Sequence, residues 1–245
     1  MIDLLNASKN RPRIDFRLVT GIMGSFILFL GCTLMLPVLI AVIYGEPSWY
    51  AFLVTGIGAI VLGCALFYQF RPKEELRMRE AFLVVSLTWF VGSLIGAFPF
   101  LLSGTLETYT DSVFETMSGF STTGATIFNG VTSDGIQNPM IEDLDKSILF
   151  WRSFTHWMGG MGIIVLTLAL LPLLGIGGMQ LYKAEYSGST SDTLTPRIQE
   201  TAFLLWSIYV GLTFAQVLLL WVHPSMDWFE AINHAFSTLA TGGFS

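Results

Sequence analysis

The sequence predicts an all-α membrane protein, and two features of its composition carry that prediction. Of its 245 residues, 53% are hydrophobic and only 12% are charged, too little charge to cover the surface of a soluble domain of this length. The charges are also clustered, so long uncharged apolar runs separate them. A run of about 18 or more apolar residues can span a bilayer as a helix. Composition therefore places the chain in the membrane class.

Five apolar runs are long enough to be transmembrane helices. They cover about 17–44, 49–70, 81–103, 147–174 and 200–222. Pro37 lies inside the first run, where we expect a kink because proline has no amide hydrogen to donate within a helix. Only the short turn at 45–48 separates the first two runs. We therefore expect the chain to cross the membrane five times.

The placement of charge orients these five helices. Lysine and arginine gather in three segments, 9–17, 71–79 and 183–197. Acidic residues with few basic neighbours mark three others, 45–48, 104–146 and 223–230. Cytoplasmic segments of membrane proteins carry an excess of lysine and arginine. Five spans that begin in the cytoplasm put every basic segment inside and every acidic one outside, which predicts a multi-pass protein of the inner (cytoplasmic) membrane with a cytoplasmic N-terminus.

Two further apolar stretches are too short to cross a bilayer, and each follows a span. One covers 111–120, and the other precedes the glycines at the end of the chain. Glu80-Ala81-Phe82-Leu83 resembles Thr201-Ala202-Phe203-Leu204 at a spacing of 121, and Thr123-Gly124 resembles Thr241-Gly242 at a spacing of 118. The order of span, short amphipathic stretch and Thr/Gly loop thus occurs twice. This predicts two pseudo-symmetric repeats around a shared axis.

The loop at 120–126, Phe-Ser-Thr-Thr-Gly-Ala-Thr, follows the first short stretch. Irregular backbone at membrane depth is tolerated only where it is buried in protein or lines a watery cavity. The loop is therefore predicted to re-enter the membrane and line a pore. The half-length helix before each loop is expected to aim its negative C-terminal end at the ion.

The composition of these loops suits a dehydrated monovalent cation, which needs several oxygens in place of its water. Backbone carbonyls can supply those oxygens. Glycine permits unusual backbone angles, and threonine adds a hydroxyl oxygen and stiffens the strand. The predicted potassium-binding filter residues, whose carbonyls and glycine turns hold the ion, are Thr122, Thr123, Gly124, Ala240, Thr241 and Gly242.

Two charged residues in apolar surroundings leave alternatives open. Glu115, on the first short stretch, either draws cations toward the pore mouth or anchors its helix by hydrogen bonds. Arg152, early in the fourth run, is either an electrostatic element near the outer pore that faces Glu115 or a structurally paired or snorkelling arginine. The pattern favours the structural alternative for both residues and leaves pore-mouth electrostatics open.

Other reactive residues are given structural roles. His156 is expected to be a buried helix contact, because no second histidine or carboxylate accompanies it at metal-ligand spacing. The glycines of 159–162 lie in an apolar run with no strand before them, which excludes a phosphate loop and favours close helix packing or a bend by the pore. Cys32 and Cys64 cannot build a disulfide or metal framework. No enzyme activity or bound cofactor is expected, the transported ion being the only metal. The net charge of −6 argues against a nucleic-acid partner.

Longer motifs resemble a known family. FETMSGFSTTGATIF at 114–128 resembles the first filter of the Trk/Ktr/HKT superfamily of potassium transporters. Four segments resemble its TrkH/TrkG branch, namely WMGGMGIIVL at 157–166, LPLLGIGGMQLYKAE at 171–185, LTPRIQETA at 194–202 and AFSTLATGGFS at 235–245. The resemblance implies potassium-channel-like pore repeats, four in one chain around one pore. It also implies a homodimer and a cytosolic, nucleotide-binding regulatory subunit of the TrkA type. Some related sodium transporters carry serine at the position of Gly124, so glycine here favours potassium.

The predicted organisation has four parts. Residues 1–75 hold a basic segment and a two-helix extra domain, 76–175 the first pore repeat, 176–198 a cytoplasmic linker, and 199–245 a second pore repeat that stops at its filter. Because the resemblance implies four repeats, we expect either a fragment or a chain that needs a partner.

The implied function is potassium uptake through a carbonyl-lined filter, channel-like or ion-coupled, as the membrane subunit of a Trk-type system. A non-conducting half-subunit and, with less support, a membrane enzyme using His156, Glu115 or Asp111 are the alternatives.

Overall fold

The computed structural model describes residues 14–71, 78–128, 139–170, 194–243 and 245. The described residues form helices joined by turns and short irregular segments, with no strand among them. This confirms the all-α fold class. Residues 1–13, which include part of the predicted basic segment at 9–17, and most of the predicted linker at 176–198 lie outside the described residues.

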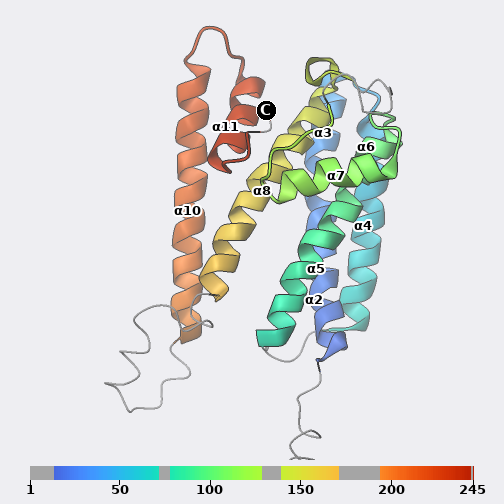
Figure 1. The fold of residues 1–245 in the computed structure, drawn as a ribbon, viewed down its shortest axis with the longest axis vertical. Coiled ribbons are helices and arrows are strands. Elements are labelled where there is room, and N and C mark those ends of the chain that lie inside the picture. The colour runs from blue at the N-terminus through green and yellow to red at the C-terminus, as the bar shows by residue number, and fades with distance from the viewer. Residues whose placement is uncertain (1–13, 72–77, 129–138, 171–193, 244) are drawn as a thin grey trace, which may run out of the picture.

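Five long helical segments correspond to the five predicted spans (Figure 1). They are α2 (Phe16–Thr33) with α3 (Met35–Tyr44), α4 (Trp49–Gln69), α5 (Met78–Gly96) with α6 (Phe98–Leu102), α8 (Lys146–Leu170) and α10 (Leu194–Trp221). Among the described residues, four stretches are long and apolar enough to cross a membrane, Phe16–Tyr44, Trp49–Gln69, Arg79–Leu102 and Glu200–Trp221. The remaining one, α8, has 25 residues and is about 37 Å long at the helical rise, which also exceeds the hydrocarbon thickness.

The kink expected near Pro37 appears as the break between α2 and α3. The helix is interrupted at Leu34, three residues before the proline. A proline ring clashes with the carbonyl of the residue four positions earlier, which here is Thr33, the last residue of α2. The break therefore lies where the sequence places the steric conflict.

Two helices of 12 residues each are too short to span. They are α7 (Tyr109–Phe120) and α11 (Trp228–Leu239). In Figure 1 both lie in the upper half of the molecule, α7 running across the long helices and α11 descending beside α10. A short 3-10 helix, η1 (Ile141–Asp143), precedes α8. Half-length helices followed by loops thus occur at both predicted positions.

Helices α2 and α4 pack closely because glycines of one face glycines of the other. A Cβ added to Gly31 would contact the carbonyl oxygen of Gly56, and a Cβ added to Gly63 would contact that of Gly24. Small residues at such positions let two backbones approach within a membrane. The N-terminal pair is therefore a tight hairpin.

This hairpin is fastened to the first repeat at the start of α8. The carboxylate of Glu46, in the turn before α4, accepts hydrogen bonds from the amides of Lys146 (2.6 Å) and Ser147 (3.0 Å). The hydroxyls of Ser48 and Ser147 are also 2.8 Å apart. An acidic group satisfies the free amides of a helix N-terminus and complements its dipole. The sequence had marked this turn only as an outer loop.

The largest buried core lies behind α7 and joins the hairpin to the first repeat. Its fully buried members include Leu34, Phe52, Phe100 and Trp151. Trp151 also donates its indole hydrogen to the carbonyl of Gly96 at 3.0 Å. The core thus packs the end of α7 against α8.

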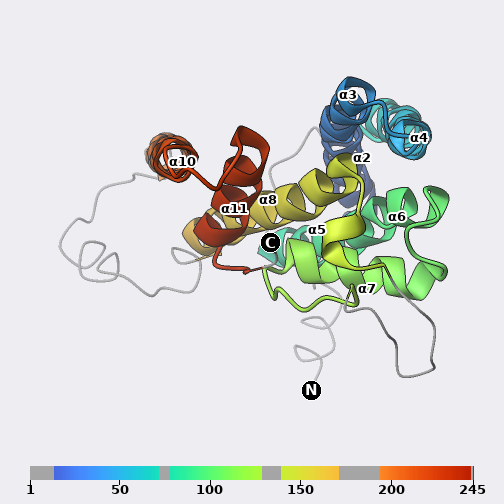
Figure 2. The same cartoon turned by 90° about the horizontal axis from the view of Figure 1, so that it is seen from above.

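Helix α8 lies between the two half-length helices, as the view from above shows (Figure 2). Aromatic rings attach it to the second repeat. The ring of Trp157 packs at 5.3 Å from that of Phe236 on α11 and 5.7 Å from that of Tyr209 on α10, and its indole donates to Thr213 at 3.0 Å. One helix therefore supports both repeats.

Candidate functional site

The two half-length helices begin in equivalent ways. Thr108 caps α7 by accepting a hydrogen bond from the amide of Asp111, and Asp227 caps α11 by accepting one from the amide of Glu230. Caps of this kind satisfy amides that have no partner within the helix. Both the helices and their caps are separated by 119 residues in the sequence. The two half-length helices therefore share their length, their type of cap and a spacing of 119 residues.

The loops that follow these helices share a hydrogen-bond pattern. In each loop two successive amides turn back to carbonyls in the last turn of the helix. In the first loop the bonds are Thr122 to Gly119 (3.0 Å) and Thr123 to Ser118 (3.0 Å). In the second loop they are Thr241 to Thr238 (2.9 Å) and Gly242 to Ser237 (3.0 Å). The backbone therefore makes the same hydrogen-bonded turn at the C-terminal end of both helices.

The loops also share two left-handed residues. Thr122 and Thr241 have φ of 54° and 59°, and Gly124 and Gly243 have φ of 74° and 69°. Glycine adopts this conformation readily, whereas a β-branched residue in it is a genuine outlier. Strained backbone of this kind costs about 1–3 kcal/mol and clusters at functional sites. The strain is repeated at the same position in both loops.

These matches correct the register estimated from sequence identity. A spacing of 118 pairs Gly124 with Gly242, but the structural spacing of 119 pairs it with Gly243. Ala240 is the C-cap of α11, a position that Ser121 occupies at the end of α7. Identity alone misled because Thr-Gly occurs in one loop as Thr-Thr-Gly and in the other as Thr-Gly-Gly. Gly243 was therefore missed.

The structure brings the two loops into contact, although 119 residues separate them. A Cβ added to Gly124 would fall against the carbonyl oxygen of Gly242. Main chain of the first loop thus touches main chain of the second. Glycine at position 124 is required both by its positive φ and by this close approach.

Helix α8 supports both loops through its glycines. A Cβ on Gly159 would fall against the carbonyl oxygen of Phe120, the last residue of α7. A Cβ on the next residue, Gly160, would lie 3.1 Å from Ala240 at the end of α11. Of the two alternatives predicted for the glycines of 159–162, close packing holds for Gly159 and Gly160, whereas Gly162 makes only an ordinary contact with Trp89 at 3.6 Å. This close packing places the ends of the two half-length helices on neighbouring residues of one helix.

Glu115 and Arg152 form an ion pair beneath the first loop. The Arg152 Nε is 2.9 Å from the Glu115 Oε1, and the side chains are 1% and 0% exposed. The same carboxylate accepts hydrogen bonds from the Thr126 hydroxyl (3.0 Å) and the Ile127 amide (3.1 Å). Arg152 also donates to the Thr126 hydroxyl at 3.2 Å. The pair therefore anchors the irregular segment that follows the loop, as a buried charge pair must be hydrogen-bonded to be tolerated.

The remaining reactive residues are arranged as follows. His156 is buried and lies against Ser237 and Gly242 of the second repeat, as the helix-contact interpretation required. Among the described residues no group of three histidine, cysteine or acidic side chains could hold a metal ion. Cys32 and Cys64 are free thiols. The carbonyls of Ser118 and Ser237 accept hydrogen bonds from loop amides, but the sequence pattern did not single out these two serines. The signal that could have found them is their spacing of 119 residues, the same as that of the two helices.

Comparisons with known proteins agree with this geometry. The profile of the TrkH family, described as cation transport protein, matches residues 49–245. The Trk system potassium uptake protein TrkH of Escherichia coli K12 is 46% identical over 235 residues, which are 95% of this chain and 46% of that protein. TrkG of the same organism is 35% identical over 232 residues, covering 94% of this chain and 46% of TrkG.

A solved structure is similar too. The crystal structure of the potassium transporter TrkH from Vibrio parahaemolyticus matches with a TM-score of 0.76 and 37% identity, over 92% of this chain and 43% of that one. The chain therefore spans less than half the length of the relatives that it matches.

Proposed function

Because this chain belongs to the TrkH family of cation transport proteins, we propose that it is part of the membrane subunit of a potassium uptake system. The observation that carries the proposal is the contact between two loops that share hydrogen bonds and left-handed residues. Loops of this kind can present main-chain oxygens to a dehydrated ion. The two half-length helices act as pore helices, whose negative C-terminal ends favour a cation at the loops.

The proposed potassium-binding residues follow the structural register. In the first loop they are Thr122, Thr123 and Gly124, and in the second Thr241, Gly242 and Gly243. Ala240 stands at the helix end, where its carbonyl borders the second loop. We propose that further repeats complete the pore, because the family resemblance implies four around one axis and the described residues contain two half-length helices with their loops.

We assign Glu115 and Arg152 to anchoring rather than to pore-mouth electrostatics. Each neutralises the other within 2.9 Å, and both are buried. A pair of opposite charges at this distance has little net field at the mouth of a pore. Its contribution to transport is to hold Thr126 and the irregular segment after the filter in place.

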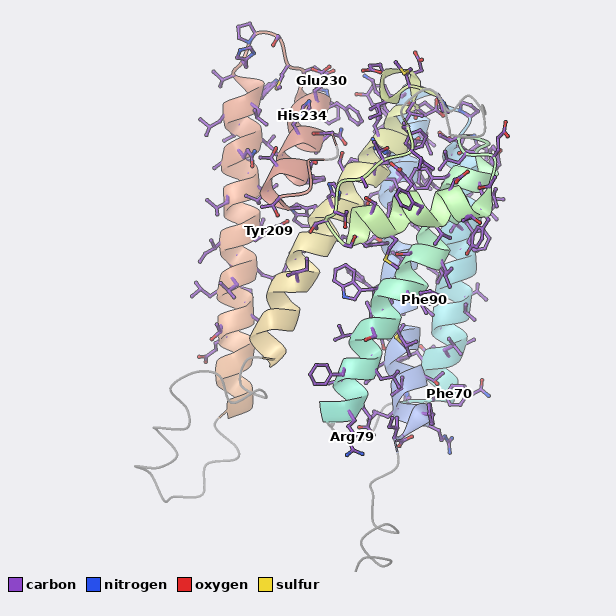
Figure 3. The ribbon with its side chains drawn as sticks, viewed as in Figure 1. Phe70, Arg79, Phe90, Tyr209, Glu230 and His234 are labelled. Carbon is purple, nitrogen blue, oxygen red and sulfur yellow. The ribbon has the colours of Figure 1, made fainter. Side chains whose placement is uncertain are left out.

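The orientation proposed from charge is supported by how the ends of the helices differ. Figure 3 shows Arg79 at the lower end of the molecule and Glu230 at the upper end. The basic end is assigned to the cytoplasm of an inner membrane. A homodimer and a cytosolic nucleotide-binding subunit of the TrkA type, both implied by the resemblance, are the proposed partners.

The test uses the complete gene in a bacterial strain that lacks potassium uptake. Growth at low potassium should be restored by the unaltered gene, and Gly124→Ser should lower the ratio of potassium to sodium uptake. Gly104→Ser is the matched control, since Gly104 has φ of 73° but no atom near its Cβ position. An unchanged ratio in Gly124→Ser would contradict the filter assignment.

Reconstitution of this chain alone in liposomes tests the alternative that it is a non-conducting half-subunit. The proposal expects no selective flux from the two repeats by themselves, and flux from the complete protein. Selective potassium flux through this chain alone would show that two repeats suffice.

A further inference from the structure

His156 lies on α8 at the place where the two loops meet, and its side chain is 0% exposed. Its Nδ1 is 3.2 Å from the hydroxyl oxygen of Ser237. The main chain of Ser118 also lies near the imidazole. Ser118 and Ser237 occupy the same position in the two repeats, so one ring contacts an equivalent residue of each.

These two serines are the residues that support the loops. The carbonyl of Ser118 accepts the amide of Thr123, and the carbonyl of Ser237 accepts the amide of Gly242, both at 3.0 Å. Ser118 also donates its hydroxyl to the carbonyl of Ala125 at 2.6 Å. A shift of either serine would therefore move the loop that it holds.

The imidazole also lies directly against the second loop. The three atoms nearest to a Cβ added at Gly242 all belong to the His156 ring. Gly242 is not among the described glycines with positive φ, so its backbone conformation does not require glycine. The ring is what excludes a side chain there. Since the carbonyl oxygen of Gly242 in turn faces Gly124, the ring, the second loop and the first loop form one continuous series of contacts.

A purely space-filling role would be served better by an apolar side chain, because burying a polar ring costs free energy unless it is hydrogen-bonded. Here the Nδ1 of the ring has a polar partner in the Ser237 hydroxyl at 3.2 Å. The selectivity of a carbonyl filter depends on the size and the oxygen field of its cavity. We propose that His156 is a positioning residue that sets the separation of the two loops and thereby the preference for potassium over sodium. This inference rests on the proposed function.

The first experiment compares His156→Leu with His156→Gln in the complete protein. Leucine fills space without polar contacts, whereas glutamine keeps a donor and an acceptor. His156→Leu should lower the ratio of potassium to sodium uptake by roughly tenfold, the scale of a lost buried hydrogen bond, and His156→Gln should retain most of it. The control is His223→Leu, a histidine in the exposed turn after α10.

The second experiment uses steric rescue. Gly242→Ala places a methyl group against the ring and should abolish selective uptake, while Gly242→Ala combined with His156→Ala should restore part of it. Gly124→Ala combined with His156→Ala should show no such recovery, because Gly124 is limited by its own φ and by the Gly242 carbonyl. This pair decides the question if His156→Leu does not reach the membrane.

The outcomes distinguish the two proposals. Absence of potassium-selective uptake in the unaltered protein would reject the proposed function. Selective uptake that survives His156→Leu, or a Gly242→Ala defect that His156→Ala does not relieve, would overturn the role of His156 and leave the function standing.

Discussion

Thr122 and Thr241, which lie 119 residues apart in the sequence, both adopt left-handed backbone conformations, with φ of 54° and 59°. Each follows the C-cap of a half-length helix and donates its amide to a carbonyl three residues earlier. An unfavourable conformation repeated at equivalent positions indicates that the surrounding contacts impose it. The expected cost in stability can be tested.

Thr122→Gly should stabilise the folded protein and also lower its selectivity for potassium. Glycine tolerates positive φ without strain, so the free energy of unfolding should rise by up to about 1 kcal/mol, measured by thermal denaturation in detergent. The ratio of potassium to sodium uptake should fall, because the loop becomes less stiff. Thr123→Gly is the control, since the φ of Thr123 is not positive, and it should destabilise. Equal effects of the two changes would contradict the strain argument.

Glu115→Gln should be among the most damaging substitutions in the first repeat. It leaves the Arg152 charge buried without its partner, a situation that costs about 3–5 kcal/mol. The unfolding temperature should fall sharply, whereas the exposed acid Glu107 should tolerate the same change. The double change Glu115→Leu with Arg152→Leu should recover part of the loss. If Glu115→Gln is as mild as Glu107→Gln, the pair does not anchor the segment after the loop.

The glycines of α8 should differ in their tolerance of alanine. Gly159→Ala forces a methyl group against the carbonyl of Phe120 and should destabilise by about 1–3 kcal/mol. Gly162→Ala is the matched control on the same helix, because its nearest neighbour is the Trp89 ring at 3.6 Å, an ordinary contact. There alanine should gain up to about 1 kcal/mol from helix propensity. Chemical denaturation of the two purified variants measures the difference, and the reverse order would be incompatible with the packing described.

Glu46→Ala should loosen the attachment of the N-terminal hairpin. It removes the carboxylate that accepts the amides of Lys146 and Ser147, and loss of such a cap costs about 1 kcal/mol. The expected result is a lower unfolding temperature and faster hydrogen exchange at those two amides. Glu142→Ala, at an exposed position in η1, should leave both unchanged. Unaltered exchange at Lys146 in Glu46→Ala would rule out the cap.

Much of the architecture could be predicted because its signals are local. The length of the apolar runs predicted five long helices, and the two short stretches predicted half-length helices before Thr/Gly loops. Transfer of apolar side chains from water and satisfaction of backbone hydrogen bonds act on neighbouring residues. The same local signals indicated that the chain is duplicated, and the motifs around the first loop indicated its family.

Only the tertiary structure decided how distant residues meet. The register of the second loop, the pairing of Arg152 with Glu115, the cap provided by Glu46 and the contact of His156 with Ser237 all depend on which helices pack together. These contacts leave no periodic pattern in the sequence. Their partners are about 40 to 120 residues apart in the chain, and they meet only because two backbones lie close together in the fold. At the ends of α7 and α11 the glycines of α8 permit that closeness, and their neighbours appear only when the chain is folded.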